Sequence, residues 1–308
     1  MKWNTKTYES SLIAIIIWLF GYSIASAATL AVLYPEVKAP YKQIFEQILD
    51  GIASQHDERL LKVSLGKKFN KANILADMEA DNVEMVITLG RRSYSFVSEL
   101  KDRYPFVSGA LPLAPNGISG VSLIADPETL FIRLNTLAPK VRRVFVVYTP
   151  RNKWLIDLAQ QSAGLKKIDL VSYEVTDLSQ AVEKYQEILK QSKSYVDAIW
   201  LPLDKTTANE KVVLPLLLKE AWRHKIVLFS NKPSHAQRGA LFSIYPDNKQ
   251  SGVRLAQMVQ EIHQLQNKPG VEPLKSLKVG VNLRTSAHLG LEYSQEQIHS
   301  FYVVFPTP

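Results

Sequence analysis

The feature that most constrains this chain is a repeated alternation of short apolar segments with longer segments of helical pattern. Apolar segments such as 29–34, 84–89 and 144–148 are each followed by hydrophobic residues at three- and four-residue spacing. Parallel strands need crossover connections, usually helices, so this alternation indicates crossover units and parallel sheets. Strands that are almost continuously apolar indicate sheets covered by helices on both faces. The sequence therefore predicts an α/β fold with parallel sheets.

Two sets of these units flank a break between Ser122 and Lys140. Within the break, Asp126-Pro127-Glu128 predicts a helix start, because it combines a side-chain cap, a proline in the first turn and an acid near the positive end of the helix dipole. We therefore expect two Rossmann-like lobes. Ligands of open parallel sheets bind beyond the carboxyl ends of the strands, so a binding cleft is predicted between the lobes.

The first 27 residues have the pattern of an export signal. Lys2 and Lys6 precede the apolar run 12–20, and Ala25-Ser26-Ala27 then supplies the small residues of a cleavage site. A membrane anchor is the alternative, but a spanning helix needs about 20 apolar residues and this run is shorter. We therefore expect residues 1–27 to be a cleavable signal peptide of an exported protein.

Several kinds of chemistry have no support in the sequence. The absence of cysteine excludes disulfides, cysteine nucleophiles and thiolate metal sites. The six histidines lack metal-ligand spacing, and there is no Walker A, G-x-G-x-x-G or G-x-S-x-G motif. We therefore expect no metal, no cofactor and no enzymatic activity. The net charge of +8 is spread over short basic clusters without a long stripe, which together with export argues against a nucleic-acid partner.

Near its C-terminus the sequence contains an apolar strand, a polar turn and a short helix, Val281-Asn282-Leu283-Arg284-Thr285-Ser286-Ala287-His288-Leu289-Gly290-Leu291. With this run, the chain resembles bacterial ABC-transporter substrate-binding proteins of the tryptophan/tyrosine-type group, which have a type I periplasmic binding protein fold. The resemblance extends over residues 29–291. It is supported by further matches in the same order, at Gly120-Val121-Ser122, at Asp204 after the strand containing Trp200, at Gly239-Ala240-Leu241, and at Asp247 and Gly252.

The resemblance implies two lobes joined by three chain crossings. Lobe one would contain residues 28–122 and 246–270, and lobe two residues 123–245 and 271–308. The implied function is a monomeric periplasmic protein that captures a small molecule, an amino acid or similar carboxylate-bearing solute, by hinge closure for an ABC permease of the inner membrane. The alternative is a periplasmic sensor or protein-interaction module on the same fold, with another membrane partner and no transport role. The tail 292–308 lies beyond the family core, and Phe301–Pro308 is a candidate edge strand.

In the first lobe, the turn Gly90–Ser93 joins a strand to a helix, where unpaired backbone N–H groups favour anions. We expect Arg91 or Ser93 to hold an anionic ligand group, with Gly90 allowing close backbone approach. The alternative is that the arginines at 91 and 92 face solvent or pair with the second lobe. Ser108 and Gly109, at the apolar segment 106–110, are candidates for donors from the same lobe.

In the second lobe, Asp204 is the candidate partner for a ligand ammonium, and its alternative role is to cap the following helix. Tyr34, from the first lobe, and Tyr245 are candidate walls of the cleft, or else core residues. The remaining candidates stand near strand ends and are Tyr148, Asn152, Thr206, Ser230, Asn231 and Asp247.

Overall fold

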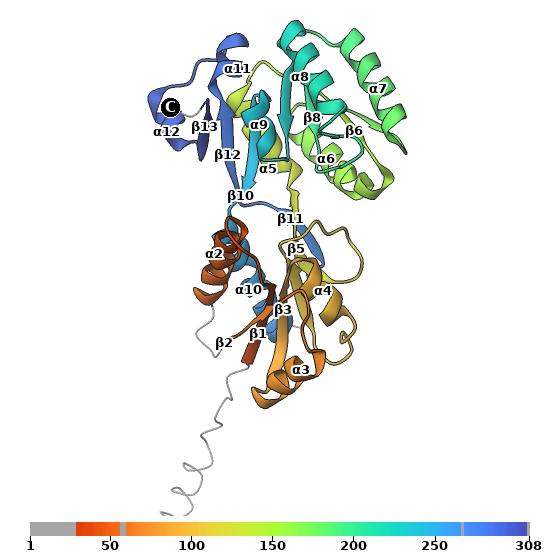
Figure 1. Cartoon of the computed structure of the whole chain (residues 1–308). Helices are drawn as coiled ribbons and strands as arrows, with labels where there is room; N and C mark the ends of the chain where they lie inside the picture. The colour runs from red at the N-terminus through yellow and green to blue at the C-terminus, as the bar shows by residue number, and fades with distance from the viewer. Residues whose placement is uncertain (1–28, 56–59, 266–267, 307–308) are drawn as a thin grey trace, which may run out of the picture.

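The computed structural model describes residues 29–55, 60–265 and 268–306, so the predicted signal peptide lies outside the described residues. The described chain forms two α/β lobes, one above the other in Figure 1, with several chain segments passing between them. Each lobe has its own sheet with helices on both faces. The predicted fold class is therefore confirmed. In these described ranges, no helix is long and apolar enough to cross a membrane.

The first sheet has six strands in the order β11-β5-β4-β3-β1-β2, and all of its pairings are parallel. Helices α2 and α10 cover one face, and α3 and α4 cover the other. The strands are β1 (Thr29–Pro35), β2 (Leu60–Leu65), β3 (Val83–Leu89), β4 (Phe106–Gly109), β5 (Ser119–Ala125) and β11 (Val271–Leu274). The helices are α2 (Tyr41–Ala53), α3 (Lys71–Ala80), α4 (Gly90–Ser98) and α10 (Asn248–Leu265).

The second sheet has seven strands in the order β13-β12-β10-β9-β8-β6-β7, with the β10–β12 pairing antiparallel and the others parallel. Its strands are β6 (Arg143–Tyr148), β7 (Asp169–Glu174), β8 (Asp197–Leu201), β9 (Val227–Ser230), β10 (Phe242–Pro246), β12 (Leu277–Asn282) and β13 (Val303–Phe305). Its helices are α5 (Pro127–Leu137), α6 (Lys153–Leu165), α7 (Leu178–Gln191), α8 (Val213–His224), α9 (Ser234–Arg238), α11 (Leu283–His288) and α12 (Gln295–Ser300), with a 3₁₀ turn at Pro150–Asn152.

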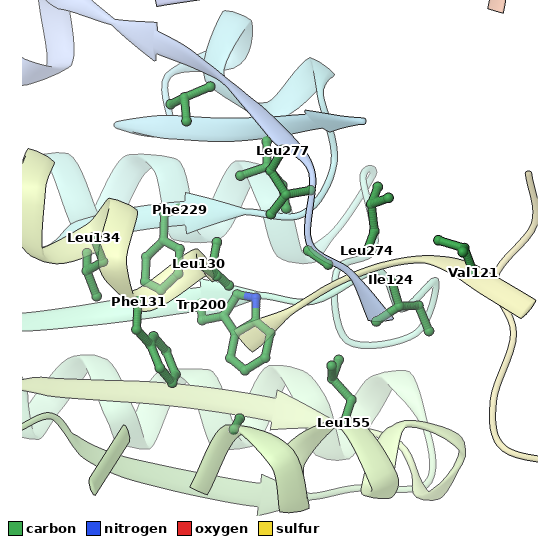
Figure 2. Packing of buried hydrophobic residues seen from close by; sticks show 14 of the residues in the cluster. Val121, Ile124, Leu130, Phe131, Leu134, Leu155, Trp200, Phe229, Leu274 and Leu277 are labelled. Carbon is green, nitrogen blue, oxygen red and sulfur yellow. The ribbon is translucent and has the colours of Figure 1, made fainter. Parts of the chain in front are cut away.

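Alternate side chains of the central strands enter two different cores, which explains why these strands are apolar throughout. In β6, Val144 and Val146 pack on the side of α5 and α6, while Phe145 and Val147 pack on the side of α7 and α8. In the adjacent strand β8, Trp200 is fully buried and meets Phe131 of α5 edge to face, with ring centroids 5.9 Å apart. Figure 2 shows this packing continuing from the second lobe to residues of the connecting strands.

Two details of the sequence interpretation are confirmed locally. The Asp126 carboxylate accepts hydrogen bonds from the backbone N–H and the hydroxyl of Thr129, at 2.9 and 2.8 Å, and so caps α5 as predicted. Strand β13, in the tail, pairs with β12 at the end of the second sheet and is therefore the edge strand that the sequence indicated.

The boundaries between the two lobes fall at other residues than those predicted from the sequence. Residues 119–125 form one strand, β5, which continues past the break expected at Ser122. Strand β11 pairs with β5 and so extends the first sheet past residue 270, where the expected boundary lies. The sequence does not reveal β11 because Glu272 and Pro273 interrupt its apolar pattern. Helix α8 begins at Val213, which places Pro215 in its first turn, where a missing backbone N–H costs no hydrogen bond within the helix.

Helices α2 and α10 approach each other closely enough to place backbone against backbone. A Cβ atom on Gly252 would lie 2.0 Å from the carbonyl oxygen of Ile48, and one on Gly51 would lie 2.0 Å from that of Lys249. No side chain fits at such a distance, so the two glycines are required by the contact. The contact fixes helix α10 against the first lobe, although α10 comes after most of the second lobe along the chain.

We predict that Gly252→Ala lowers the free energy of unfolding by about 1–3 kcal/mol, because the added methyl group overpacks the helix contact. Thermal unfolding of the purified protein measures the effect. Gly164→Ala is the matched control: Gly164 lies in α6 with no atom within 4 Å of the added Cβ. That substitution should stabilise the protein by roughly 0.5–1 kcal/mol through helix propensity. Equal melting temperatures for the Gly252→Ala variant and the unsubstituted protein would contradict the predicted contact.

Candidate functional site

A cavity of about 540 Å³ lies between the two lobes, beside the segments that connect them. Its volume is within the range of small-molecule sites, roughly 300–1,000 Å³. The first lobe lines it with residues of α2, the end of β4, β5, β11 and α10: Tyr41, Ile44, Phe45, Ile48, Gly109, Ala110, Val121, Ser122, Leu123, Asn248, Ser251, Leu255 and Leu274. The second lobe contributes Leu203, Asn231, Pro233, Ile244, Tyr245, Pro246, Leu277 and Tyr302.

Asn231 follows β9 and lines the cavity, and the nitrogen of its side-chain amide is buried without a hydrogen-bond partner. The buried indole N–H of Trp200 donates to Asn231 Oδ1 at 2.5 Å. This bond fixes which amide atom is the oxygen, because the indole nitrogen can only donate. Asn231 is 7% exposed, and its Nδ2 has no hydrogen-bond partner. A buried donor without an acceptor is costly, so this amide favours a ligand that offers one.

Four further polar side chains of the wall are engaged within the protein, whereas the tyrosines at 41 and 302 are exposed. The Tyr245 hydroxyl donates to the carbonyl oxygen of Pro233 at 3.0 Å. The Ser122 hydroxyl donates to the Leu113 carbonyl and accepts from its N–H, both at 2.9 Å. Ser251 Oγ donates to the backbone of the preceding helical turn, and Asn248 Nδ2 donates to a glutamine of α2. The wall is therefore mainly apolar, with Asn231 as its unsatisfied amide.

Three of the residues predicted from the sequence, Gly109, Asn231 and Tyr245, line this one cavity. Gly109 is backed by Leu255, whose Cδ1 would lie 2.6 Å from an added Cβ, so a side chain here would force the Leu255 side chain to shift. The next residue, Ala110, has a left-handed backbone with φ of 58°. Such strain at a non-glycine residue is typical of functional sites. Sequence reasoning missed Ala110, Tyr41, Phe45 and Tyr302, because their place in the cavity depends on tertiary packing.

A second predicted group, Asn152, Asp204 and Thr206, forms a hydrogen-bond cluster inside the second lobe. Asp204 Oδ2 accepts from the N–H and hydroxyl of Thr149 and from Asn152 Nδ2, at 2.6–3.1 Å. Asp204 Oδ1 accepts from the N–H groups of Thr206 and Thr207. This is the capping role given as the alternative for Asp204, although the residues that follow form a turn and not a helix. A ligand ammonium would have to compete with five donors for this carboxylate.

In the turn at the start of α4, which the sequence predicts to bind an anion, two of the side chains are already hydrogen-bonded within the lobe. Gly90 has φ of 79°, and Ser93 is buried with its hydroxyl donating to the Leu89 carbonyl at 3.0 Å. Arg91 is exposed, while Arg92 donates to the carbonyl oxygen of Leu65 at 2.6 Å. The side chains of this turn do not line the cavity described above. Their role in anion binding stays a prediction.

The remaining predicted residues lie apart from the cavity lining. Ser108 bonds to Thr88 inside the first lobe with an oxygen–oxygen distance of 2.6 Å. Tyr148 is buried at the end of β6, and Tyr34 is partly buried at the end of β1. The Asp247 carboxylate accepts from the N–H of Gln250 at the start of α10 and pairs with Lys278 at 3.3 Å.

Ser230, His235 and Glu210 lie next to one another in space, but the serine and the histidine are not accessible to a substrate. Ser230 Oγ lies 2.8 Å from His235 Nδ1, and His235 Nε2 lies 3.7 Å from Glu210 Oε1. Ser230 and His235 are both completely buried, and burial is the main cause that lowers the pKa of His235 to about 4. The shifted pKa is therefore explained by burial in the lobe, without a catalytic role.

His235 should make the stability of the protein depend on pH. Its folded-state pKa of about 4 lies below the unfolded value of about 6.5. The unfolded state therefore binds more protons between these values, and stability falls as pH decreases through this range, by up to about 1.4 kcal/mol per pH unit. Denaturant unfolding from pH 7 to pH 4 measures the slope. We expect His235→Gln to flatten it and His299→Gln, at an exposed histidine, to leave it unchanged; an unaltered slope in His235→Gln would exclude this origin.

Comparison with known proteins identifies one family. The family model described as ABC transporter substrate binding protein matches residues 51–300. No curated protein matches the chain in sequence.

Solved structures with this fold include three that are similar over most of both chains. A conserved domain protein from Vibrio cholerae has 19% identity and a TM-score of 0.51, covering 90% of this chain and 99% of its own. An ABC domain in complex with L-Trp from Streptococcus pneumonia has 16% identity and a TM-score of 0.52, covering 91% and 100%. A ligand-free, open substrate binding protein with adhesive properties from Clostridium difficile has 14% identity and a TM-score of 0.61, also covering 91% and 100%. These similarities show the type I periplasmic binding protein fold.

Proposed function

This chain belongs to the ABC transporter substrate-binding proteins, and from that premise we propose that it captures a small solute by closing its lobes and delivers it to an ABC importer. The observation that carries the proposal is the cavity between the lobes, which both lobes line and which adjoins their connections. In the same proposal the protein is exported to the periplasm, acts as a monomer and binds without catalysing a reaction. Its membrane partner is then the permease of the importer.

The connections between the lobes support a hinge motion. The chain passes between the sheets through β5, between β10 and α10, and between β11 and β12. Neighbouring connections are joined by backbone hydrogen bonds, from Asp126 N–H to the Leu274 carbonyl at 2.8 Å and from Asp247 N–H to the Ser276 carbonyl at 3.0 Å. Hinge closure needs changes at only a few such residues at the ends of elements. Since both lobes line the cavity, a ligand that contacts both walls favours the closed state.

The groups that would indicate catalysis do not gather at this cavity. Among the residues that the structure describes, no three histidine or acidic side chains are placed to hold a metal ion. The serine and histidine that do meet are sealed inside the second lobe. These observations favour reversible binding over turnover, as in the rest of the proposal.

Ligand binding should stabilise the protein and make it more compact. A ligand at about 100 times its dissociation constant adds about 2.7 kcal/mol of stability, which corresponds to several degrees in melting temperature. The measurement is thermal unfolding against amino acids, organic acids, nucleosides, sugars and neutral aromatic amides, after partial unfolding has removed bound ligand. Small-angle X-ray scattering should then show a smaller radius of gyration with the compound that binds. No shift with any compound would favour the alternative of a sensor or interaction module on this fold.

A substitution in the cavity should separate ligand binding from folding. Ile44 lines the cavity on α2, so Ile44→Glu should weaken binding of that compound at least about tenfold by placing a charge where the lobes close. Gln43→Glu adds the same charge to an exposed neighbour outside the lining and should leave binding unchanged. Equal affinities for the two variants would place the ligand elsewhere.

A further inference from the structure

We propose that the inter-lobe cavity selects an uncharged, largely apolar solute that carries a hydrogen-bond acceptor, and that the C-terminal tail forms part of its wall through Tyr302. This inference rests on the proposed function, since it names the class of solute that the same cavity would take. It differs from the amino acid or carboxylate expected from the sequence. Three features of the wall support it: the lack of charged side chains among its described residues, the unpaired nitrogen of the Asn231 amide, and the two tyrosine rings on one side.

No charged side chain lines the cavity among the residues that the structure describes. The nearby charges of Lys278 and Asp247 pair with each other at 3.3 Å. The carboxylate of Asp204 is engaged by five donors, and Arg91 and Arg92 lie outside the lining. Burying an unpaired carboxylate or ammonium costs far more than burying a neutral group. The cavity therefore disfavours zwitterions and anions.

The Asn231 amide supplies a polar contact that an apolar cavity can use for orientation. Trp200 holds the amide oxygen, so the amide nitrogen is the group left without a partner. Because Nδ2 is also closed to solvent, a ligand carbonyl or ether oxygen would reach this donor only as the wall rearranges around the ligand, and would then recover the cost of leaving the donor buried and unpaired. A neutral acceptor on an otherwise apolar solute matches this wall.

The C-terminal tail brings a second aromatic ring to the wall. The N–H of Tyr302 donates to the Val279 carbonyl at 2.9 Å, and the Tyr302 ring lies 5.3 Å from that of Tyr245. Gly280 makes room for this arrangement, since a Cβ there would lie 2.6 Å from the Tyr245 ring and 2.8 Å from Val303. The two rings form one apolar side of the cavity, which suits an aromatic or aliphatic ligand face.

Tyr302 also separates this cavity from a second one of about 310 Å³ on the second lobe. Leu277 and Tyr302 line both cavities, whereas the cations Arg133 and Lys278 line only the second. The Tyr302 ring is held here by Tyr245 on one side and by Lys278, whose ammonium lies 5.3 Å from the ring centroid. The tail thus forms a partition, with the positive charges outside the proposed ligand site.

The test compares compounds that share a ring and differ in charge. Phenylacetamide, phenylacetate and phenylalanine form one series, and the naphthyl counterparts form the second, each titrated into the purified protein by calorimetry. We expect the neutral amide to bind at least about tenfold more tightly than its charged partners in one or both series. An acid or amino acid that binds as tightly as its amide would overturn this inference while leaving the proposed function intact. Failure of every compound here, together with no shift in the broader solute panel, would overturn both.

Two variants test the wall itself with the amide that binds. Asn231→Asp keeps the acceptor for Trp200 but removes the donor, so affinity should fall about tenfold or more. Tyr302→Ala should weaken binding at least about fivefold, and Tyr302→Phe should restore it, because the ring makes the contact. Tyr173→Ala is the matched control, since Tyr173 lies on the opposite edge strand β7 with Lys184 over its ring, as Lys278 lies over Tyr302. Unchanged affinity in both Asn231→Asp and Tyr302→Ala would overturn the assignment of this wall.

Discussion

The close contact of α2 with α10 is the constraint on which the rest of this structure depends. Gly51 and Gly252 let the two backbones meet, so the helix that follows the second lobe in sequence is held against the first lobe. This return produces the later crossings between the lobes and places β11 beside β5, where Arg254 of α10 binds Glu272 of β11 at 2.6 Å. The same return brings Leu255 behind Gly109 at the cavity. The second and third crossings between the lobes thus depend on two residues without side chains.

The sequence predicts those parts of the fold whose local pattern and burial agree. Strands β6 and β8 are buried on both faces and largely apolar, and the cap at Asp126 is complete within four residues. The strands and the cap can therefore be predicted from the sequence. Strand β11 is not, because Glu272 and Pro273 are accommodated by α10 and by an edge position that local sequence does not reveal. A local sequence pattern indicates one element at a time, whereas β11 is a strand only because β5 pairs with it.

The same distinction explains which of the predicted site residues reach the inter-lobe cavity. Strand ends led to Gly109, Asn231 and Tyr245, which line it, because parallel strands bring their carboxyl ends to one edge. They also led to Asp204, whose carboxylate is occupied by Thr149 and Asn152, more than fifty residues earlier. A sequence shows a polar group but not the partners that already satisfy it. Conversely, Tyr302 reaches the cavity from the tail, where no strand-end argument applies.

The second-lobe wall of the cavity combines parts fixed by side-chain hydrogen bonds with a more exposed part. At the end of β9 and just beyond it, Ser230 is fixed by His235, the Asn231 oxygen by Trp200, and the Pro233 carbonyl by Tyr245. Fixing these groups before a ligand arrives reduces the entropy lost on binding, so a single amide can orient a ligand. Tyr302, by contrast, is held through its backbone while its ring is largely exposed. In the proposed site, specificity for one polar atom and tolerance in apolar shape therefore belong to different elements.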